Sequence, residues 1–442
     1  MPDYPLTYTY GRALLRNELV QRAEEGAEPA PLQALRTEIE SVSGDAMERD
    51  AFEEIYARIL AVPVWAGWPY DEPSDLERIR ARRPEGPRRL SPGRNLDDRV
   101  YAAWLGRAAG CVLGKPVEGW PRERITRYLR AVDAYPLSSY IPPPPQDMPD
   151  PGWRPSATES LLGHIDGVPR DDDLDYPILN LTVAEEHSTN ITPPLIADAW
   201  LAHLPYEGIY TAERLAYRNL IDEYAPPASA SRYNPYREWI GAQIRADLWG
   251  YICPGEPERA AALAWQDASV SHTANGIYGE MFVAALVAAA LADVTLDEAI
   301  DVAVAEIPAQ SRFAEMVHQV RGWADGHVDW EICRDRIEDV YGQYHWVHTL
   351  NNAAVVIMAL ACSGGNYSRG ITIAVMGGWD TDCNGATVGS VLGALSGTSA
   401  ISPEWAEPLH DTVRSFVIGH STQRLSNLAA RTRAVTRAAE GR

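Results

Sequence analysis

Apolar residues recur at spacings of three and four along most of the 442-residue chain, the period of helices that bury one face. Alternating apolar and polar positions with hairpin-turn signals, which would indicate strands, are scarce. We therefore predict an all-α fold. The helical period is clearest in residues 12–25, 49–62, 98–114, 211–224, 258–270, 296–307 and 351–364.

Prolines and glycines concentrate between these segments and divide the chain into three predicted parts. Residues 1–95 are expected to form an N-terminal helical extension that ends in a Pro- and Gly-rich linker. Residues 96–420 are expected to form one compact multi-helix domain, followed by a C-terminal tail over 421–442.

The net charge and the cysteine content limit the classes of function that the sequence allows. The net charge of -22 and the pI of about 4.9 argue against non-specific binding to nucleic acid or to an anionic membrane surface. The longest apolar run, Met281 to Ala292, is too short to span a bilayer. Five dispersed cysteines and the lack of a secretory signal pattern favour reduced thiols in a cytoplasmic protein. Lys115 is the only lysine.

Two acidic clusters stand where helical patterns begin. Asp380 and Asp382 follow a glycine pair, and the run Asp171, Asp172, Asp173 precedes another helix pattern. A single carboxylate there can simply cap the helix. Consecutive aspartates raise one another's pKa, so convergence of the two clusters would require cations. Oxygen ligands select Mg²⁺, Mn²⁺ or Ca²⁺ over zinc.

One interpretation of an aspartate-rich all-α protein is an isoprenoid synthase. Asp171, Asp172 and Asp175 spell the DDxxD motif of those enzymes. The second metal motif of such enzymes normally ends in a downstream acidic residue, and "DTDCNGATVGSV" contains none at that place. With 4 phenylalanines in the chain, a cavity for an isoprenoid chain is also a poor match.

A better match is the ADP-ribosylglycohydrolase family, which four stretches of the chain resemble in the right order. "AAWLGRAAGCVLGKPVEGW" (102–120) resembles its opening G-D-x-x-G-x-P-x-E segment, and "DDDLDYPIL" (171–179) its T-D-D-T segment. "IGAQIRADLWG" (240–250) with "DASVSHTANGIYG" (267–279) resembles the middle segments. "GGWDTDCNGATVGSVLGAL" (377–395) is similar to the G-G-D-T-D-T-x-A signature, the most specific of the four.

The resemblance implies an all-α catalytic domain over residues 96–420 that hydrolyses an N- or O-glycosidic bond at C1″ of an ADP-ribosyl group, using Mg²⁺. Two ions are expected, with Mn²⁺ as an alternative. The metal ligands it implies are Asp171, Asp172, Asp173, Asp380 and Asp382. Glu118 falls on the loop glutamate that acts as general base or gate, although an exposed loop glutamate without a catalytic role is the competing interpretation.

The substrate contacts implied by the resemblance come from the glycine-rich loops and from the middle segments. His272 and the Asn275-Gly276 pair would hold the phosphate end, but a satisfied histidine at a helix start is an alternative. Arg245 would face the diphosphate, or would form a structural salt bridge. The full set is Gly114, Arg245, His272, Asn275, Gly276, Gly377, Gly378 and Cys383.

Four positions depart from the family pattern. Cys111 replaces an aspartate, Asp171 and Leu174 replace threonines, and Cys383 replaces the last threonine of D-T-D-T. Because thiols are poor Mg²⁺ ligands, we expect Asp171 to compensate for a lost ligand. The middle segment also departs from the family's glycine-Asn-glycine pattern, where the adenosine end should bind. The substrate is therefore left open between an ADP-ribosylated protein, an ADP-ribosylated small molecule, a nucleic-acid adduct and another N- or O-riboside. A catalytically silent ADP-ribose or nucleotide sensor is the alternative function.

Overall fold

The computed structural model describes residues 6–41, 44–146, 148, 154–324 and 329–440. Within these ranges the chain is helical apart from loops and one two-stranded antiparallel sheet, which confirms the all-α prediction. The strands are β1 (Thr412–Arg414) and β2 (Thr422–Arg424), paired with Val413 opposite Gln423. None of the described helices is long and apolar enough to cross a membrane.

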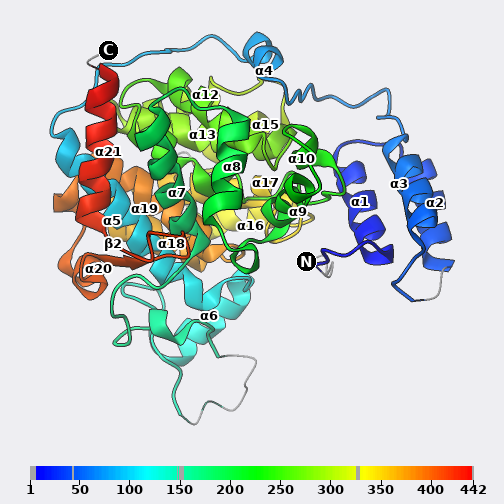
Figure 1. The fold of residues 1–442 in the computed structure, drawn as a ribbon. Helices are drawn as coiled ribbons and strands as arrows, with labels where there is room; N and C mark the ends of the chain where they lie inside the picture. Colours follow the sequence, from blue (N-terminus) through cyan, green and yellow to red (C-terminus); the bar gives the residue numbers. More distant parts are fainter. Residues whose placement is uncertain (1–5, 42–43, 147, 149–153, 325–328, 441–442) are drawn as a thin grey trace.

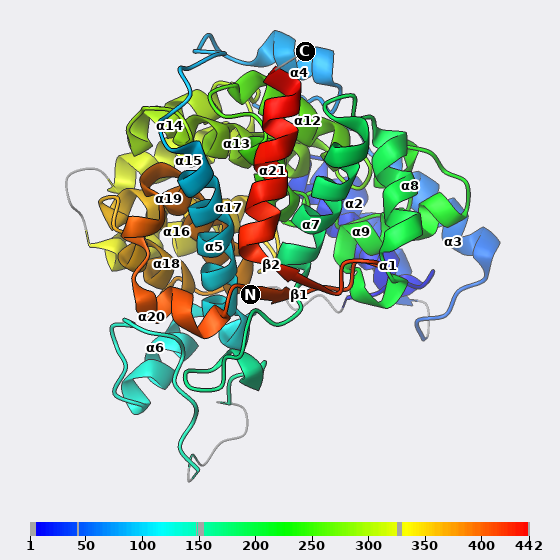
Figure 2. The same ribbon diagram turned by 60° about the vertical axis from the view of Figure 1, so that its left-hand side comes forward.

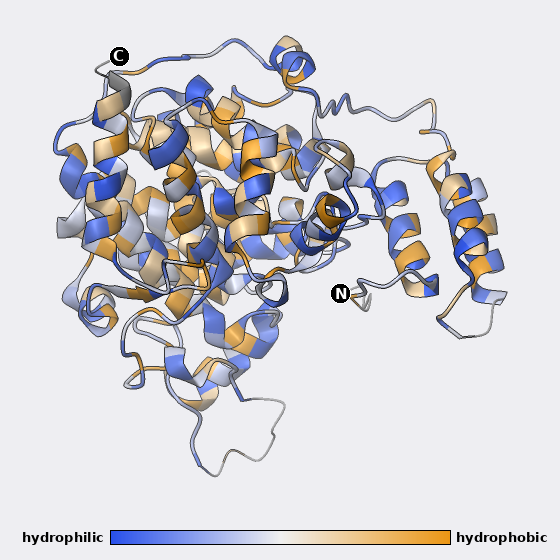
Figure 3. Ribbon diagram, in the orientation of Figure 1, coloured by the Kyte–Doolittle hydropathy of each residue, from blue (hydrophilic) through white to orange (hydrophobic). Residues whose placement is uncertain are grey.

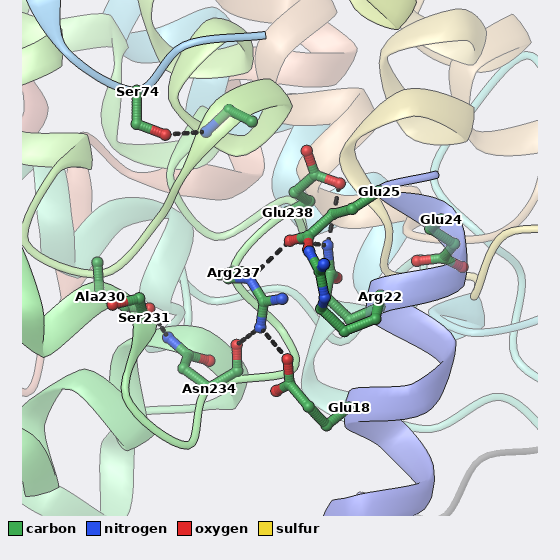
Figure 4. Close-up of polar contacts among 12 residues, drawn as sticks. Glu18, Arg22, Glu24, Glu25, Ser74, Ala230, Ser231, Asn234, Arg237 and Glu238 are labelled. Atoms are coloured by element: carbon green, nitrogen blue, oxygen red, sulfur yellow. Dashed lines mark hydrogen bonds and ion pairs between the residues drawn. The ribbon is translucent and has the colours of Figure 1, made fainter. Parts of the chain in front are cut away.

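The first three helices of the N-terminal extension lie together on one side of the main body, and its fourth helix lies apart from them at the top of the view (Figure 1). Its helices are α1 (Arg12–Glu24), α2 (Pro29–Ser41), α3 (Arg49–Leu60) and α4 (Leu76–Arg82). Buried ion pairs attach it to the body: Arg237 Nη1 lies 2.8 Å from Glu18 Oε1, and Arg237 Nε lies 2.7 Å from Glu25 Oε1 (Figure 4). The linker that follows α4 crosses the top of the view to reach the body.

The body consists of helices packed around a continuous apolar core. Most helices carry both hydrophobic and hydrophilic residues, as the mixed colours of Figure 3 show, and turn the former inward. Its helices are α5 (Leu96–Gly114), α6 (Arg122–Ala131), α7 (Asp172–His187), α8 (Pro193–His203), α9 (Thr211–Ile221), α10 (Ala228–Ser231), α11 (Asp247–Tyr251), α12 (Pro257–Ala268), α13 (Ala274–Ala290), α14 (Leu296–Val304), α15 (Arg312–Ala324), α16 (Trp330–Tyr341), α17 (Thr349–Ser363), α18 (Tyr367–Met376), α19 (Thr381–Ser396), α20 (Pro403–Ala406) and α21 (Leu425–Glu440).

The apolar run that begins at Met281 belongs to α13, whose residues 275–290 are all buried. Residues 421–442 were expected to be a tail, but the structure describes β2 and α21 there, and α21 packs beside α5 (Figure 2). Trp104 Nε1 on α5 donates to Thr432 Oγ1 on α21 at 3.1 Å. The three-part division of the chain stays a prediction.

Helices α5 and α19 form the central antiparallel pair of the body, and small residues let their backbones meet. Gly106 faces Gly389, Gly110 faces Gly385, and Gly114 faces Thr381. At each level a Cβ atom on the glycine would fall inside the contact distance of the opposite backbone. The antiparallel arrangement brings the C-terminus of α5 beside the N-terminus of α19.

Candidate active site

Three helix ends meet at the acidic clusters. The C-terminus of α5 continues into a single 3-10 turn, η1 (Lys115–Val117), and then reaches Glu118. Asp171 is the N-cap of α7, and Asp380 precedes α19 in the same way. Asp171 and Asp382 act on each other electrostatically, as do Asp172 and Asp382. The structure therefore brings together the two clusters that lie about two hundred residues apart in the sequence.

Asp171 is buried and both of its oxygens have donors. Oδ2 lies 2.5 Å from Nζ of Lys115, and Oδ1 accepts the backbone N–H of Asp173 at 3.0 Å. Burial alone would raise the pKa of Asp171, but the ammonium of Lys115, the N–H of Asp173 and the charge of Arg170 together outweigh it, and the pKa falls below its usual value. Asp171 thus points into the site, as it must if it replaces a lost metal ligand. Its partner there is Lys115.

Asp173 is paired in the interior beneath Asp171. Arg107 on α5 donates from Nη2 to Asp173 Oδ1 and from Nη1 to Asp247 Oδ2, both at 2.8 Å. All three side chains are buried. A guanidinium between two buried carboxylates is a structural tie between α5, α7 and α11, and it uses an oxygen that a metal ion would otherwise take.

Asp380 and Asp382 are different, because each has a buried oxygen without a hydrogen-bond donor among the described residues. These atoms are Asp380 Oδ1 and Asp382 Oδ1, on side chains only 4% and 5% exposed. The backbone around them is held by Asn352 on α17, whose Oδ1 accepts from the Asp380 N–H at 3.2 Å and from Asn384 Nδ2 at 2.9 Å. Two neighbouring buried carboxylate oxygens without hydrogen-bond donors cost folding free energy unless a cation binds them.

The acidic groups raise one another's pKa. Burial, followed by the charge of Asp171, raises the pKa of Asp172 to about 7. Burial and Asp171 also raise the pKa of Asp382 to about 6, and burial with Asp382 raises that of Asp380 well above its usual value. Such shifts are typical of a site whose carboxylates are arranged for a cation.

The residues fit a hard divalent ion at this end of the site. Ligand atoms of Asp380, Asp382 and Cys383 lie within 4.8 Å of one another. Cys111, Asp171 and Asp173 form a second such group, but a thiol is a poor ligand for Mg²⁺ and both carboxylates there already have cationic partners.

Glu118 lies beside the aspartates at the end of η1. Part of the residue is exposed to solvent, yet the charge of Asp382, followed by burial of the carboxyl group, raises its pKa well above the usual value. Asp171 and Asp172 add to this effect. The carboxyl group of Glu118 therefore belongs to the same electrostatic cluster as the proposed ligands.

The glycines of the loops have packing roles at the same place. Gly378 has φ +80, and its backbone approaches residues 120–122, directly after Glu118. The carbonyl of Gly377 accepts from Arg334 Nε at 2.8 Å. Gly114 allows the contact between α5 and the first turn of α19. All three set the position of the site loops.

The residues predicted to hold the phosphate end are bound within the protein. Asn275 Nδ2 donates to Glu238 at 3.0 Å, and Asn275 Oδ1 accepts from the Phe313 N–H at 3.0 Å. His272 is 1% exposed and pairs through Nδ1 with Ser271 Oγ at 2.8 Å. A Cβ at Gly276 would lie 2.5 Å from the Arg237 carbonyl. These contacts favour the structural alternatives that the sequence left open.

Arg245 is also held on all sides. It is fully buried and forms ion pairs with Asp267 at 2.9 Å, Glu213 at 2.5 Å and Glu280 at 3.4 Å. Its donors are committed to carboxylates, so the salt-bridge interpretation is the one that its contacts favour.

The DDxxD interpretation requires Asp175 to face the same cation as Asp171 and Asp172. Asp175 instead binds Arg170 Nε at 2.8 Å and the Phe416 N–H at 2.9 Å. Its role is to attach the strand region to α7.

Sequence reasoning missed three residues of the site: Lys115, Arg107 and Asn352. Lys115 had one available signal, since every other basic residue apart from the histidines is an arginine. Arg107 and Asn352 lie inside helical patterns, where nothing in the sequence distinguishes a site residue from an ordinary polar position.

A sequence model of a family described as ADP-ribosylglycohydrolase matches residues 92–441. Among solved structures, the chain is similar to a protein described as an "ADP-ribosylglycohydrolase-related protein complex", with a TM-score of 0.45 and 19% identity over 77% of this chain and 98% of the other. No curated protein matches the sequence.

Proposed function

The chain belongs to the ADP-ribosylglycohydrolase family, and from this premise we propose that it hydrolyses the bond between C1″ of an ADP-ribosyl group and its leaving group in a Mg²⁺-dependent reaction. Membership of the family supports glycosidic hydrolysis in general. The metal, the bond and the substrate are the parts that we propose.

One observation carries the proposal: buried, donor-free oxygens of Asp380 and Asp382 lie in the same electrostatic cluster as Asp172 and Glu118. Glu18 and Glu280 also have a donor-free oxygen, but each pairs with an arginine, whereas no basic side chain of the described residues pairs with Asp380 or Asp382. Carboxylate oxygens without hydrogen-bond donors are suitable ligands for a hard divalent cation.

When bound there, Mg²⁺ would orient ribose hydroxyls and lower the pKa of a water molecule. The chain's own residues supply the rest. Asp380 and Asp382 would hold the ion, and Asn352 fixes the backbone of Asp380. Glu118, whose pKa is raised by Asp382, is a stronger base than an ordinary carboxylate and accepts a proton from the attacking water.

The substrate class remains the one that the sequence indicated, an ADP-ribosylated protein or a small ADP-ribosyl compound. The internal bonding of Asn275 and Arg245 indicates that other residues hold the phosphate end of the substrate. A cytoplasmic location is part of the proposal, supported by five free cysteines.

Turnover of a panel of ADP-ribosyl substrates tests the proposal. Release of ADP-ribose from N- and O-linked substrates should require added Mg²⁺ and stop with EDTA, and Asp380→Asn should abolish it. The competing function, a silent sensor, predicts binding of ADP-ribose by calorimetry without turnover of any member of the panel.

A further inference from the structure

Lys115 stands inside the acidic site at the position where a second cation would sit. Its Nζ lies 2.5 Å from Asp171 Oδ2 and 2.6 Å from the carbonyl oxygen of Arg170. Asp171 is the residue that replaces a threonine of the family pattern and that the sequence suggested as a metal ligand. The ammonium group thus occupies the coordination space of one predicted ligand.

With Asp171 held by Lys115, the ligands that are left at this end of the site are too few for a second ion. Asp173 is tied to Arg107, and the third member of the group, Cys111, offers a thiol. Two carboxylates are therefore balanced by two cationic side chains, Lys115 and Arg107. Among the described residues, Asp380 and Asp382 form no ion pair, and each keeps a buried oxygen without a donor. The uncompensated negative charge lies at the other end.

We propose that Lys115 is a built-in cation that takes the place of one of the two expected metal ions, so that the centre binds a single divalent ion through Asp380 and Asp382. This inference rests on the metal-dependent site of the proposed function, and it corrects the expected number of ions from two to one.

The kind of basic residue supports the assignment. Lysine carries a compact charge on a flexible stem, whereas arginine carries a wide planar fork. In a chain whose other fixed cations are arginines, the one lysine stands against the carboxylate that was predicted as a metal ligand. Asp171 in place of the family's threonine fits the replacement of a metal ion by an ammonium group. A buried ammonium group needs a negatively charged partner, which a neutral threonine hydroxyl does not supply.

Binding of Mn²⁺ to the full chain gives the test, with no need for a substrate. Bound Mn²⁺ is counted after equilibrium dialysis, and its electron paramagnetic resonance spectrum is recorded. The wild-type protein should bind one ion and give the six-line signal of an isolated Mn²⁺. Lys115→Ala should free Asp171 and raise the count to two, with the broad multiline signal of a coupled pair. Lys115→Arg, which keeps the charge, should bind one ion.

Arg336→Ala, which removes an exposed cation on α16, is the matched control and should behave as wild type. Two coupled ions in the wild-type protein would overturn the inference, whether or not Lys115→Ala folds, and so would no bound Mn²⁺. A count of one in a folded Lys115→Ala variant would also refute the role of Lys115. Lack of turnover with a correct count would instead refute only the hydrolase activity.

Discussion

Gly110 on α5 and Gly385 on α19 pack backbone against backbone, so that a Cβ atom on either would collide with the carbonyl group of the other. The same contact recurs one turn away at Gly106 and Gly389. Because the two helices are antiparallel, their spacing at these glycines sets the distance between the loop of Glu118 and the first turn of α19. Packing in the core and geometry of the site are therefore linked.

Gly110→Ala should destabilise the protein by about 2–3 kcal/mol, since overpacking against backbone leaves little room to relax. Mg²⁺-dependent stabilisation should weaken as well, because α5 and α19 are pushed apart. Gly322→Ala on α15 is the control: a Cβ there meets nothing within 4 Å, and the variant should be neutral or slightly more stable. Urea unfolding with and without Mg²⁺ measures both effects. Equal stability of the two variants would contradict the packing argument.

Asp380→Asn should have opposite effects on the metal-free and the metal-loaded protein. It removes a buried negative charge from a cluster of like charges, so the metal-free protein should unfold at a higher temperature. The increase in melting temperature caused by Mg²⁺ should disappear, since a ligand is lost. Asp166→Asn changes a carboxylate that is 86% exposed and should leave both values unchanged. Retention of the full Mg²⁺ effect in Asp380→Asn would remove Asp380 from the site.

Several elements of this architecture could be predicted from the sequence for a physical reason. Apolar residues that recur with a period of 3.6 identify buried helix faces. The run from Asp171 to Asp173 indicates a helix start whose negative charge must be balanced. Small residues at helical spacing over 385–397 are typical of close helix packing, and the structure shows such packing at Gly385, Gly389 and Gly393. These signals are local in the sequence, so they can be interpreted without knowing which distant segment packs against them.

The pairings that decide the chemistry are long-range and could not be predicted. Lys115 and Asp171 lie 56 residues apart, and Asn352 reaches Asp380 across 28 residues. Asn275 was assigned to a ligand by its position in a motif, but Glu238 and Phe313 take its hydrogen bonds. A polar residue in a helix pattern does not reveal which neighbour the fold will place against it.

The stability of the metal-free protein should fall with rising pH because of Asp172. Burial and Asp171 raise the pKa of Asp172 to about 7 from an ordinary value of 3.8, so the folded state binds more protons than the unfolded state between these values. The unfolding free energy relative to Asp172→Asn, which does not titrate, should therefore decrease from about pH 4 to about pH 7 and then level off. Saturating Mg²⁺ should remove the decrease. A difference that is constant with pH would show that Asp172 is not perturbed.

Glu118→Gln should lower kcat while leaving the affinity for ADP-ribose nearly unchanged. The substitution keeps the size and hydrogen-bonding capacity of the side chain but removes its basicity, and loss of a general base typically costs about 10²–10⁴ in rate. Glu123→Gln, an exposed glutamate in the first turn of α6, is the matched control and should retain wild-type activity. The pH–rate profile separates a base from a positioning residue: the limb on the acidic side should be lost in Glu118→Gln, because the raised pKa of Glu118 that defines it no longer exists. Equal turnover of Glu118→Gln and Glu123→Gln on a confirmed substrate would return Glu118 to the role of an exposed loop residue.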